Sequence, residues 1–320
     1  MIRLISPVPQ INSLLDLTVV LKTQVPIINE ILRNVKNEYN CFSIYKRNGK
    51  KRNIFAPNPL LKDIQKNILT KILDKCRISR YAYGFKKNYS IIDNARMHIG
   101  SKKLVKMDIK DFFPSIRHNR ILRIFMEIGY SRNISLYLTK LCCLDNKLPQ
   151  GAPTSPALSN IFFKDIDNEI IGFSICRNII YTRYADDLAF SGNIHPHSIF
   201  DKISDILQRY KLKVNQKKCV LRRPYQQQKV TGIIVNEKLN TQKKYRKKIR
   251  QEMYYIKKFG LRAHCQNINN KILRKKYLMG LYGRINFVLR VNPNLQEFSE
   301  YKQYLLSLYD LNHYDLLRVG

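Results

Sequence analysis

Two adjacent aspartates near the middle of the chain have the residue type and the surroundings to do chemistry. Asp186 and Asp187 lie between two short apolar and aromatic runs, a pattern typical of a strand, a tight turn and a second strand. Taken alone, such a pair is most simply explained as a solvated hairpin turn, because aspartate is common in turns. Asp108 is harder to explain, because it lies in the apolar run 104–109. A charged group there costs free energy unless it is paired or binds a metal.

The elements that must position these carboxylates follow from the order of the predicted strands and helices. A strand is also expected over 229–235. Before it, a strand at 104–109 is followed by helices, by the two strands around the Asp186–Asp187 turn, by a helix near 199–210 and by a further strand that ends near residue 221. This order is the split βαβ arrangement of ferredoxin-like folds. In that topology the end of the first strand and the hairpin turn lie at the same edge of one sheet. We therefore expect Asp108 to lie close to the turn.

Carboxylates that converge in this way repel one another and raise each other's pKa values unless cations neutralise them. Two Mg²⁺ ions roughly 3.5–4 Å apart would do so, and would also activate an attacking oxygen and stabilise a leaving phosphate. The chemistry that these residues predict is phosphoryl transfer on nucleotides. Because successive strand side chains alternate between faces, Asp186 and Asp187 should not act equally. Asp108 and Asp186 are the expected bridging ligands, and Asp187 is expected to bind partly through outer contacts.

The overall charge favours nucleic acid as a partner. The chain of 320 residues has 58 Lys and Arg against 23 Asp and Glu, a formal net charge of +35. A polyphosphate ligand gains affinity from each counterion that it releases. A solubility role or an anionic membrane surface is the alternative, but no basic amphipathic membrane helix stands out.

No signal peptide and no apolar run long enough to span a membrane is visible in the sequence, so we expect no membrane partner. The seven cysteines have no C-x-x-C spacing. This pattern predicts reduced structural thiols and a cytoplasmic protein.

Several other segments have two open interpretations. The basic turn 46–52 joins two strand-like runs and is either a solvated turn or a phosphate clamp. The loop 148–156 either caps the next helix, with Ser155 as N-cap, or lets its backbone approach a planar ligand closely. Asn94 and His98 share a helix face, which is either a polar contact or ordinary surface or core.

A basic helix begins near residue 243, with Lys243, Lys244 and Lys247 opposite an apolar face that includes Ile249 and Met253. Such a run of charge is either a solvated face or a grip on nucleic acid. The phosphoryl-transfer residues elsewhere in the chain favour the grip.

The ordered set of motifs resembles the palm of reverse transcriptases. The set consists of Asp108 with Phe112 and Phe113, then Gln-Gly-Ala-Pro-Thr-Ser-Pro at 150–156, then Tyr-Ala-Asp-Asp at 184–187. Within that family the chain is similar to bacterial retron enzymes. Two short segments carry this closer likeness: Asn94, Ala95 and His98 resemble the retron Asn-Ala-x-x-His signature, and Val230, Thr231 and Gly232 resemble its Val-Thr-Gly.

The resemblance implies an α+β fold, a right-hand polymerase with fingers, a ferredoxin-like palm and a helical thumb. The expected domains are N-terminal helices and fingers over 1–102, a palm over 103–235 with a helical fingers insertion at about 118–148, and a basic thumb over 236–320.

The resemblance also implies residue roles. Arg52 would hold the incoming triphosphate, and Phe113 would act as a steric gate against the ribose 2′-hydroxyl, the group that distinguishes RNA from DNA precursors. Lys218 or Lys217 would lie near the triphosphate, and Ile109 would offer its backbone carbonyl to a metal. Gln150 and Gly151 would lie beside the nucleotide and template. The residues expected to contact RNA are Asn94, His98, Val230, Thr231, Gly232, Lys243, Lys244 and Lys247.

The implied activity is RNA-directed DNA synthesis with deoxynucleotides and two Mg²⁺ ions, or Mn²⁺ in their place. Such an enzyme would copy part of its own structured non-coding RNA from an RNA 2′-hydroxyl and leave a branched, RNA-linked DNA (msDNA). A separate effector protein would make the pair an antiphage defence module. The alternatives are an intron-type reverse transcriptase, an RNA polymerase, which Phe113 disfavours, and a non-catalytic RNA-binding protein, which would have no reason to bring Asp108 and Asp186 together.

Overall fold

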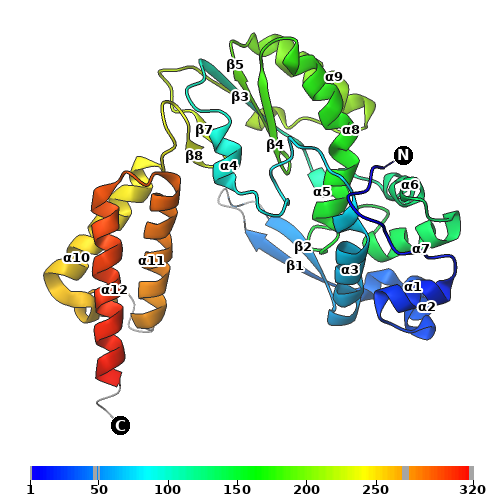
Figure 1. Ribbon diagram of the computed structural model, residues 1–320, viewed down its shortest axis with the longest axis horizontal. Coiled ribbons are helices and arrows are strands. Elements are labelled where there is room, and N and C mark those ends of the chain that lie inside the picture. The colour runs from blue at the N-terminus through cyan, green and yellow to red at the C-terminus, as the bar shows by residue number, and fades with distance from the viewer. Residues whose placement is uncertain (1, 46–48, 50, 269–273, 317–320) are drawn as a thin grey trace. The chain divides into compact units, whose positions relative to one another are not determined.

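The computed structural model describes residues 2–45, 49, 51–268 and 274–316. The chain divides into two compact units (Figure 1). The first contains residues 1–90 and 103–221, and the second contains residues 91–102 and 222–320. Residues 91–102 thus group with the C-terminal part of the chain, and the three-part division into fingers, palm and thumb stays a prediction.

The first unit is built on a four-stranded sheet. The strand order is β4, β5, β3, β6, with bounds Ile180–Tyr184, Asp187–Gly192, Lys103–Asp108 and Val220–Arg222. β5 is antiparallel to both β3 and β4, so β3 and β4 run in the same direction. This is the predicted split βαβ order, and it places the end of β3 beside the β4–β5 turn.

Two helices, α8 (Ser155–Ile175) and α9 (Pro196–Arg209), lie against one face of this sheet (Figure 1). Their apolar side chains share a core with Val105, Met107 and Phe190 of the strands. Because strand side chains alternate between faces, Asp108 lies on the opposite face from Val105 and Met107. The carboxylate edge is therefore on the face that α8 and α9 leave uncovered.

The segments before β3 and between α5 and α8 add helices around a second core of the first unit. These elements are α1 (Leu14–Leu21), α2 (Val25–Arg33), η1 (Val35–Glu38), α3 (Pro59–Lys71), η2 (Leu73–Lys75), α6 (His118–Ile128) and α7 (Arg132–Cys142). The short helices α5 (Phe112–Ser115) and η3 (Gln216–Lys218) flank the end of β3. A hairpin of β1 (Tyr39–Tyr45) and β2 (Lys51–Pro57) has the predicted position, and residues 46–48 and 50 of its basic turn lie outside the described residues.

In its described residues, the second unit combines a short helix, a small hairpin and long helical segments, of which α10 is kinked at Gly260. They are α4 (Ile91–Arg96), β7 (Lys229–Val230), β8 (Ile233–Ile234), α10 (Lys243–Ile268), α11 (Arg274–Val291) and α12 (Gln296–Leu316). The long helices pack through a core that includes Ile249, Met253 and Phe298. Among the described residues, no helix is both long and apolar enough to cross a membrane.

The single strand expected over 229–235 is wrong. Thr231 and Gly232 have φ angles of 48° and 88°, which turn the chain between β7 and β8. A two-residue turn with both φ angles positive matches the right-handed twist of a hairpin. Val230, Thr231 and Gly232 therefore form a hairpin corner that packs near α4.

Candidate active site

Asp108, at the end of β3, is buried and fully paired. The residue is only 5% exposed. Asn215 Nδ2 donates to Oδ1 at 3.1 Å, and Lys218 Nζ lies 2.6 Å from Oδ2. The backbone N–H of Asn215 also donates to the Asp108 carbonyl at 2.7 Å. The acid inside an apolar strand thus has an explanation, and of the two candidate lysines it is Lys218 that the structure places beside it.

The turn between β4 and β5 brings Asp186 and Asp187 to the same edge. Asp187 is the register partner of Asp108, and partners in an antiparallel pair point to the same face. The Asp186 carbonyl accepts a hydrogen bond from Ile109 N at 3.0 Å. Ala185, the residue before Asp186, has a φ of 57° and makes the turn tight.

The carboxylates in this turn have raised pKa values. Burial is the largest cause for Asp186, followed by the negative charges of Asp108 and Asp187. Burial is also the largest cause for Asp187, where the positive charge of Lys106 opposes it and Asp108 adds to it. Burial would lower the pKa of Lys218, but its hydrogen bond to Asp108 and the three negative charges raise it.

The donor set fits divalent cations by its chemistry. Carboxylate and carbonyl oxygens are the ligands that Mg²⁺ and Mn²⁺ prefer. The raised pKa values of Asp186 and Asp187 come first from burial and then in part from neighbouring carboxylates, and bound cations would favour the charged forms. As the side chains stand, no three His, Cys, Asp or Glu among the described residues are arranged to hold a metal ion. The ammonium group of Lys218 instead neutralises Asp108, so cation binding at Asp108 would require Lys218 to move aside.

The residues predicted to bind the nucleotide lie in two places. Arg52 is exposed on β2, and the loop with Gln150 and Gly151 packs on that strand. The Gln150 carbonyl accepts a hydrogen bond from Phe55 N at 2.8 Å. Gly151 has a φ of 137°, and a Cβ there would lie 2.5 Å from the Phe55 carbonyl oxygen, so only glycine fits. Phe113 lies on α5 and is half-buried.

The N-cap prediction for the helix after this loop is wrong. Thr154 occupies the N-cap position of α8, and Ser155 is already its first residue. The Ser155 hydroxyl donates instead to the Pro149 carbonyl at 2.7 Å. The Ser155 side chain therefore stabilises the loop 149–155 and does not cap the N-terminus of α8.

The residues of the two retron signatures belong to the second unit, and most of them are buried there. Asn94, His98 and Val230 are 2%, 0% and 1% exposed, which favours a structural role over direct contact with RNA. Burial lowers the pKa of His98 to about 4, so the ring is neutral near pH 7 and offers no charge to a phosphate. Thr231 Oγ1 donates to the Ile91 carbonyl at 2.9 Å, and Gly232 is exposed at the hairpin corner.

The basic face predicted on α10 is confirmed in its position. Lys243, Lys244 and Lys247 are exposed, and Ile249 and Met253 are buried on the other side of the helix. Contact of these lysines with RNA stays a prediction.

A buried ion pair beneath the β4–β5 turn was not found from the sequence. Arg183 is 0% exposed and holds Asp167 with two hydrogen bonds, Nε to Oδ1 at 2.9 Å and Nη2 to Oδ2 at 2.8 Å. Its Nη1 donates to Asn160 Oδ1 at 3.0 Å and lies 3.4 Å from the Ala185 carbonyl oxygen. Tyr181 donates to Asp167 at 2.8 Å. One feature of the sequence could have indicated this pair: Arg183 lies within an apolar strand, and a buried arginine requires an acidic partner.

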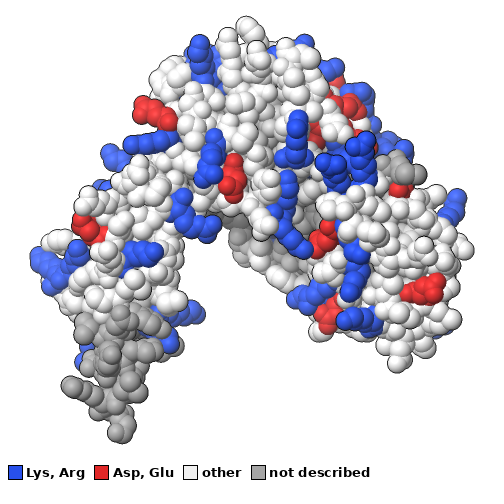
Figure 2. Space-filling model, in the orientation of Figure 1, with Lys and Arg blue, Asp and Glu red and all other residues white. Residues whose placement is uncertain are grey.

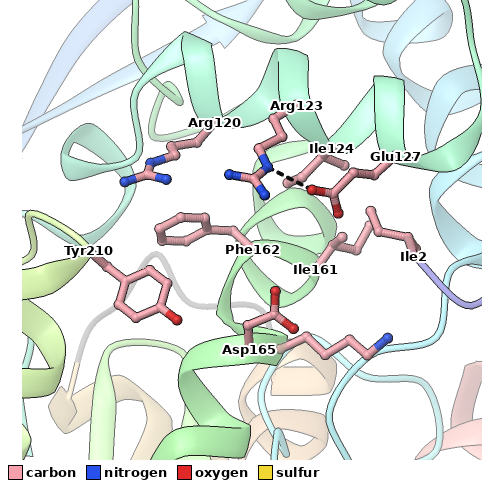
Figure 3. A pocket seen from close by; sticks show the side chains of 10 residues that line it. Ile2, Arg120, Arg123, Ile124, Glu127, Ile161, Phe162, Asp165 and Tyr210 are labelled. Atoms are coloured by element: carbon pink, nitrogen blue, oxygen red, sulfur yellow. Dashed lines mark hydrogen bonds and ion pairs between the residues drawn. The ribbon is translucent and has the colours of Figure 1, made fainter.

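A separate pocket of about 270 Å³ lies on the first unit, where α6, α8 and the end of α9 meet (Figure 3). Arg120 and Arg123 from α6 point toward the rings of Phe162 and Tyr210, and Arg123 is paired with Glu127. Asp108, Asp186 and Asp187 lie on other elements, so this pocket is not part of the acidic edge.

Comparisons with known proteins identify the family. The family model described as reverse transcriptase (RNA-dependent DNA polymerase) matches residues 44–235. The retron Ec86 reverse transcriptase of Escherichia coli is 36% identical over 253 residues, which cover 78% of this chain and 79% of that protein. The chain belongs to the retron reverse transcriptases. It is therefore an RNA-directed DNA polymerase, an enzyme of a family that uses divalent metal ions and nucleic-acid templates.

Other relatives agree with this assignment. The retron Mx65 reverse transcriptase of Myxococcus xanthus is 31% identical over 263 residues, which cover 75% of this chain and 61% of that protein. Among solved structures, a foamy viral protease-reverse transcriptase in complex with double-stranded DNA matches 86% of this chain and 39% of its own, with a TM-score of 0.50 and 19% identity. At that identity the likeness shows the polymerase fold alone.

Proposed function

We propose that this retron reverse transcriptase uses two Mg²⁺ ions, with Asp108 and Asp186 as the bridging ligands and Asp187 as a partly outer ligand. The observation that carries the proposal is the convergence of the three carboxylates at one sheet edge. After burial, the largest effect on the pKa of Asp186 is the charge of Asp108, which raises it, whereas the largest charge effect at Asp187 is that of Lys106, which lowers it. This difference supports the unequal roles of the two neighbours.

The remaining residues of the site bind and orient the substrates. Divalent cations held by these carboxylates would activate the attacking hydroxyl and stabilise the leaving pyrophosphate. Lys218, which pairs with Asp108 in this structure, would lie near the triphosphate, and Arg52 would hold the triphosphate from β2. Phe113 excludes the ribose 2′-hydroxyl. Ile109 contributes its carbonyl, and Gln150 and Gly151 line the nucleotide and template side.

The substrate that this proposal assigns is the enzyme's own structured non-coding RNA together with deoxynucleoside triphosphates. Synthesis starts at an RNA 2′-hydroxyl and leaves a branched msDNA. The enzyme acts in the cytoplasm with a separate effector protein, as an antiphage module. The similarity to retron reverse transcriptases supports this reading, and the exposed lysines of α10 supply a surface for the RNA.

The variant Asp186→Asn tests the metal assignment. We expect DNA synthesis to fall by roughly 10³-fold or more, since an amide oxygen cannot replace a charged ligand at a site of developing charge. RNA affinity should stay within about twofold, because the binding surface keeps its phosphate contacts. Primer extension with Mg²⁺ and a filter-binding titration measure the two quantities. The exposed Asp201 of α9 provides the control, Asp201→Asn; synthesis retained by Asp186→Asn would overturn the assignment.

Sequencing the nucleic acid that co-purifies with the protein tests the product. A DNA whose 5′ end is joined to an RNA 2′-oxygen supports the branched msDNA. A linear DNA without that linkage contradicts it.

A further inference from the structure

Phe85 has a backbone conformation that its side chain makes costly. Its φ is 59°, in the left-handed region, which is uncommon for residues other than glycine and strained for a bulky one. The residue is nevertheless 45% exposed, so burial does not account for the strain. Such a residue persists only where its surroundings fix it, and strain of this kind gathers at functional sites.

The surroundings that fix Phe85 belong to the catalytic turn. Gly84 precedes it, and a Cβ on Gly84 would lie 2.6 Å from Ala185 N, so the backbone of this segment abuts the turn. Asn160, fully buried, donates to the Gly84 carbonyl at 2.9 Å. The same side chain accepts the hydrogen bond from Arg183. The position of Phe85 is thus set by the network that supports the β4–β5 turn at Ala185.

The segment before Phe85 also runs alongside β4. Tyr83 N donates to the Arg183 carbonyl at 2.8 Å, and Arg183 N donates to the Tyr81 carbonyl at 2.9 Å. These two hydrogen bonds add a short edge to the sheet. The backbone that delivers Phe85 is therefore anchored at both its start and its end.

The ring of Phe85 rests against Phe113. The two centroids are 5.9 Å apart and the planes differ by 32°. Phe113 also contacts Phe112, at 5.3 Å, and Phe112 packs in turn on Phe163, at 5.3 Å. Phe113 therefore has one buried aromatic neighbour, Phe112, and one exposed aromatic neighbour, Phe85.

We propose that Phe85 is a second determinant of sugar selection, a positioning residue that keeps the Phe113 ring across the path of a ribose 2′-hydroxyl. The proposal rests on the proposed function, in which Phe113 is the gate. A gate excludes a hydroxyl only if its ring cannot swing aside, and an aromatic neighbour in contact removes such alternative positions. The substrates that Phe85 separates are deoxyribonucleoside and ribonucleoside triphosphates.

A purely structural role for Phe85 leads to a different result. Loss of packing alone would lower stability and would slow the use of both kinds of triphosphate to a similar extent. Loss of the gate support would instead raise ribonucleotide use and leave deoxynucleotide use nearly unchanged. The ratio of kcat/KM for the two substrates therefore separates the roles.

The experiment measures single-nucleotide incorporation on an RNA template, with kcat and KM for a dNTP and for its matched rNTP. For Phe85→Ala we expect the preference for the dNTP to fall about tenfold, with kcat for the dNTP within about threefold of the original. Phe85→Tyr should keep the preference, because the ring is kept. Phe85→Asn removes the ring but tolerates a left-handed backbone, so it should lose the preference without added strain.

Tyr89→Ala is the matched control. Tyr89 is 43% exposed in the same segment, but its ring packs against Tyr83 at 5.3 Å and beneath the ammonium of Lys86 at 3.9 Å. We expect its sugar preference to equal that of the original protein. An equal loss of preference in Tyr89→Ala and Phe85→Ala would overturn the assignment to Phe85.

Phe113→Ala, measured in parallel, separates failure of this inference from failure of the proposed function. If Phe113→Ala lowers the preference and neither Phe85→Ala nor Phe85→Asn does, only the role of Phe85 is wrong. If Phe113→Ala leaves the preference unchanged, the gate itself is wrong and the role of Phe85 with it. In the double variant the two losses should be less than additive, since both residues act through one ring.

Discussion

At the scale of single residues, the site depends on partners that are distant along the chain. Asn215 and Lys218 lie 107 and 110 positions after Asp108, yet both hydrogen-bond its carboxylate. Burial of Asp108 is tolerated because both of its oxygens are satisfied, one by a neutral donor and one by a charged donor. The residues that stabilise the buried Asp108 carboxylate therefore come from a distant segment of the chain and not from its neighbours in sequence.

The burial of His98 predicts an acid-sensitive second unit. Its pKa is lowered from 6.5 to about 4 by burial, so the unfolded chain binds a proton between these values and the folded chain does not. Stability should therefore be complete above about pH 6.5 and should decrease by about 3 kcal/mol as the pH falls to about 4. His98→Gln should lose this share of the pH dependence in denaturant melts at pH 7 and pH 5.

The exposed His118 is the comparison for this prediction. His118→Gln should keep the pH dependence of the original protein. Equal pH dependence in His98→Gln and in the original protein would show that His98 is not the group responsible.

At the scale of elements, the β4–β5 turn is held from below by α8. Arg183 of β4 reaches Asp167 and Asn160 of α8, and its guanidinium carbon lies 4.6 Å from the centre of the Phe163 ring. Burial would lower the pKa of Arg183, but the charge and hydrogen bonds of Asp167 raise it, so the arginine stays charged. The helix that follows the Gln150 loop therefore also supports the turn that carries Asp186.

Replacing either Arg183 or Asp167 alone should lower the free energy of unfolding. Arg183→Leu leaves the Asp167 charge buried and uncompensated, and we expect it to lower the free energy of unfolding by roughly 3–5 kcal/mol. Asp167→Leu should do the same for Arg183. The double variant should be less destabilised than the sum of the two, because it leaves no unpaired charge. Urea titrations followed by circular dichroism measure all three, and strictly additive losses would contradict the pairing.

At the scale of the whole molecule, positive charge is spread widely over the surface. Figure 2 shows lysine and arginine side chains across the viewed face with fewer acids among them, in keeping with the formal charge of +35. A field of this sign attracts nucleic acid from a distance and makes its binding dependent on salt. The lysines of α10 are one defined part of this field.

Replacing three of those lysines should change the salt dependence of RNA binding. In the triple variant Lys243→Ser, Lys244→Ser, Lys247→Ser, we expect the slope of log K against log salt to become shallower by about 2, since each lost phosphate contact removes about 0.7–0.9 from it. Titrations of the cognate RNA at several salt concentrations measure the slope.

A control triple variant has the same loss of charge elsewhere. Lys62→Ser, Lys71→Ser, Lys140→Ser removes exposed lysines of α3 and α7 and should leave the slope within about 0.5 of the original. The same change of slope in both triple variants would mean that net charge, and not the face of α10, governs binding.

The sequence by itself determined the arrangement of the carboxylate edge. The alternation of apolar residues and the order of strands and helices predict the split βαβ sheet, and the handedness of βαβ connections then places Asp108 beside the Asp186–Asp187 turn. These rules act through the backbone and depend little on particular side chains. The ordered palm motifs add the family, which the comparisons confirm.

Only the tertiary structure decided which side chains meet. The pairing of Asp108 with Lys218, the burial of Asn94 and His98, the ion pair of Arg183 and the strained Phe85 all join segments that are far apart in the chain. Such contacts depend on how helices and loops pack, and local sequence patterns do not encode that packing. The strand prediction over 229–235 was wrong for a related reason. Thr231 adopts a left-handed backbone conformation, which is uncommon for threonine and could not be expected from the residue type.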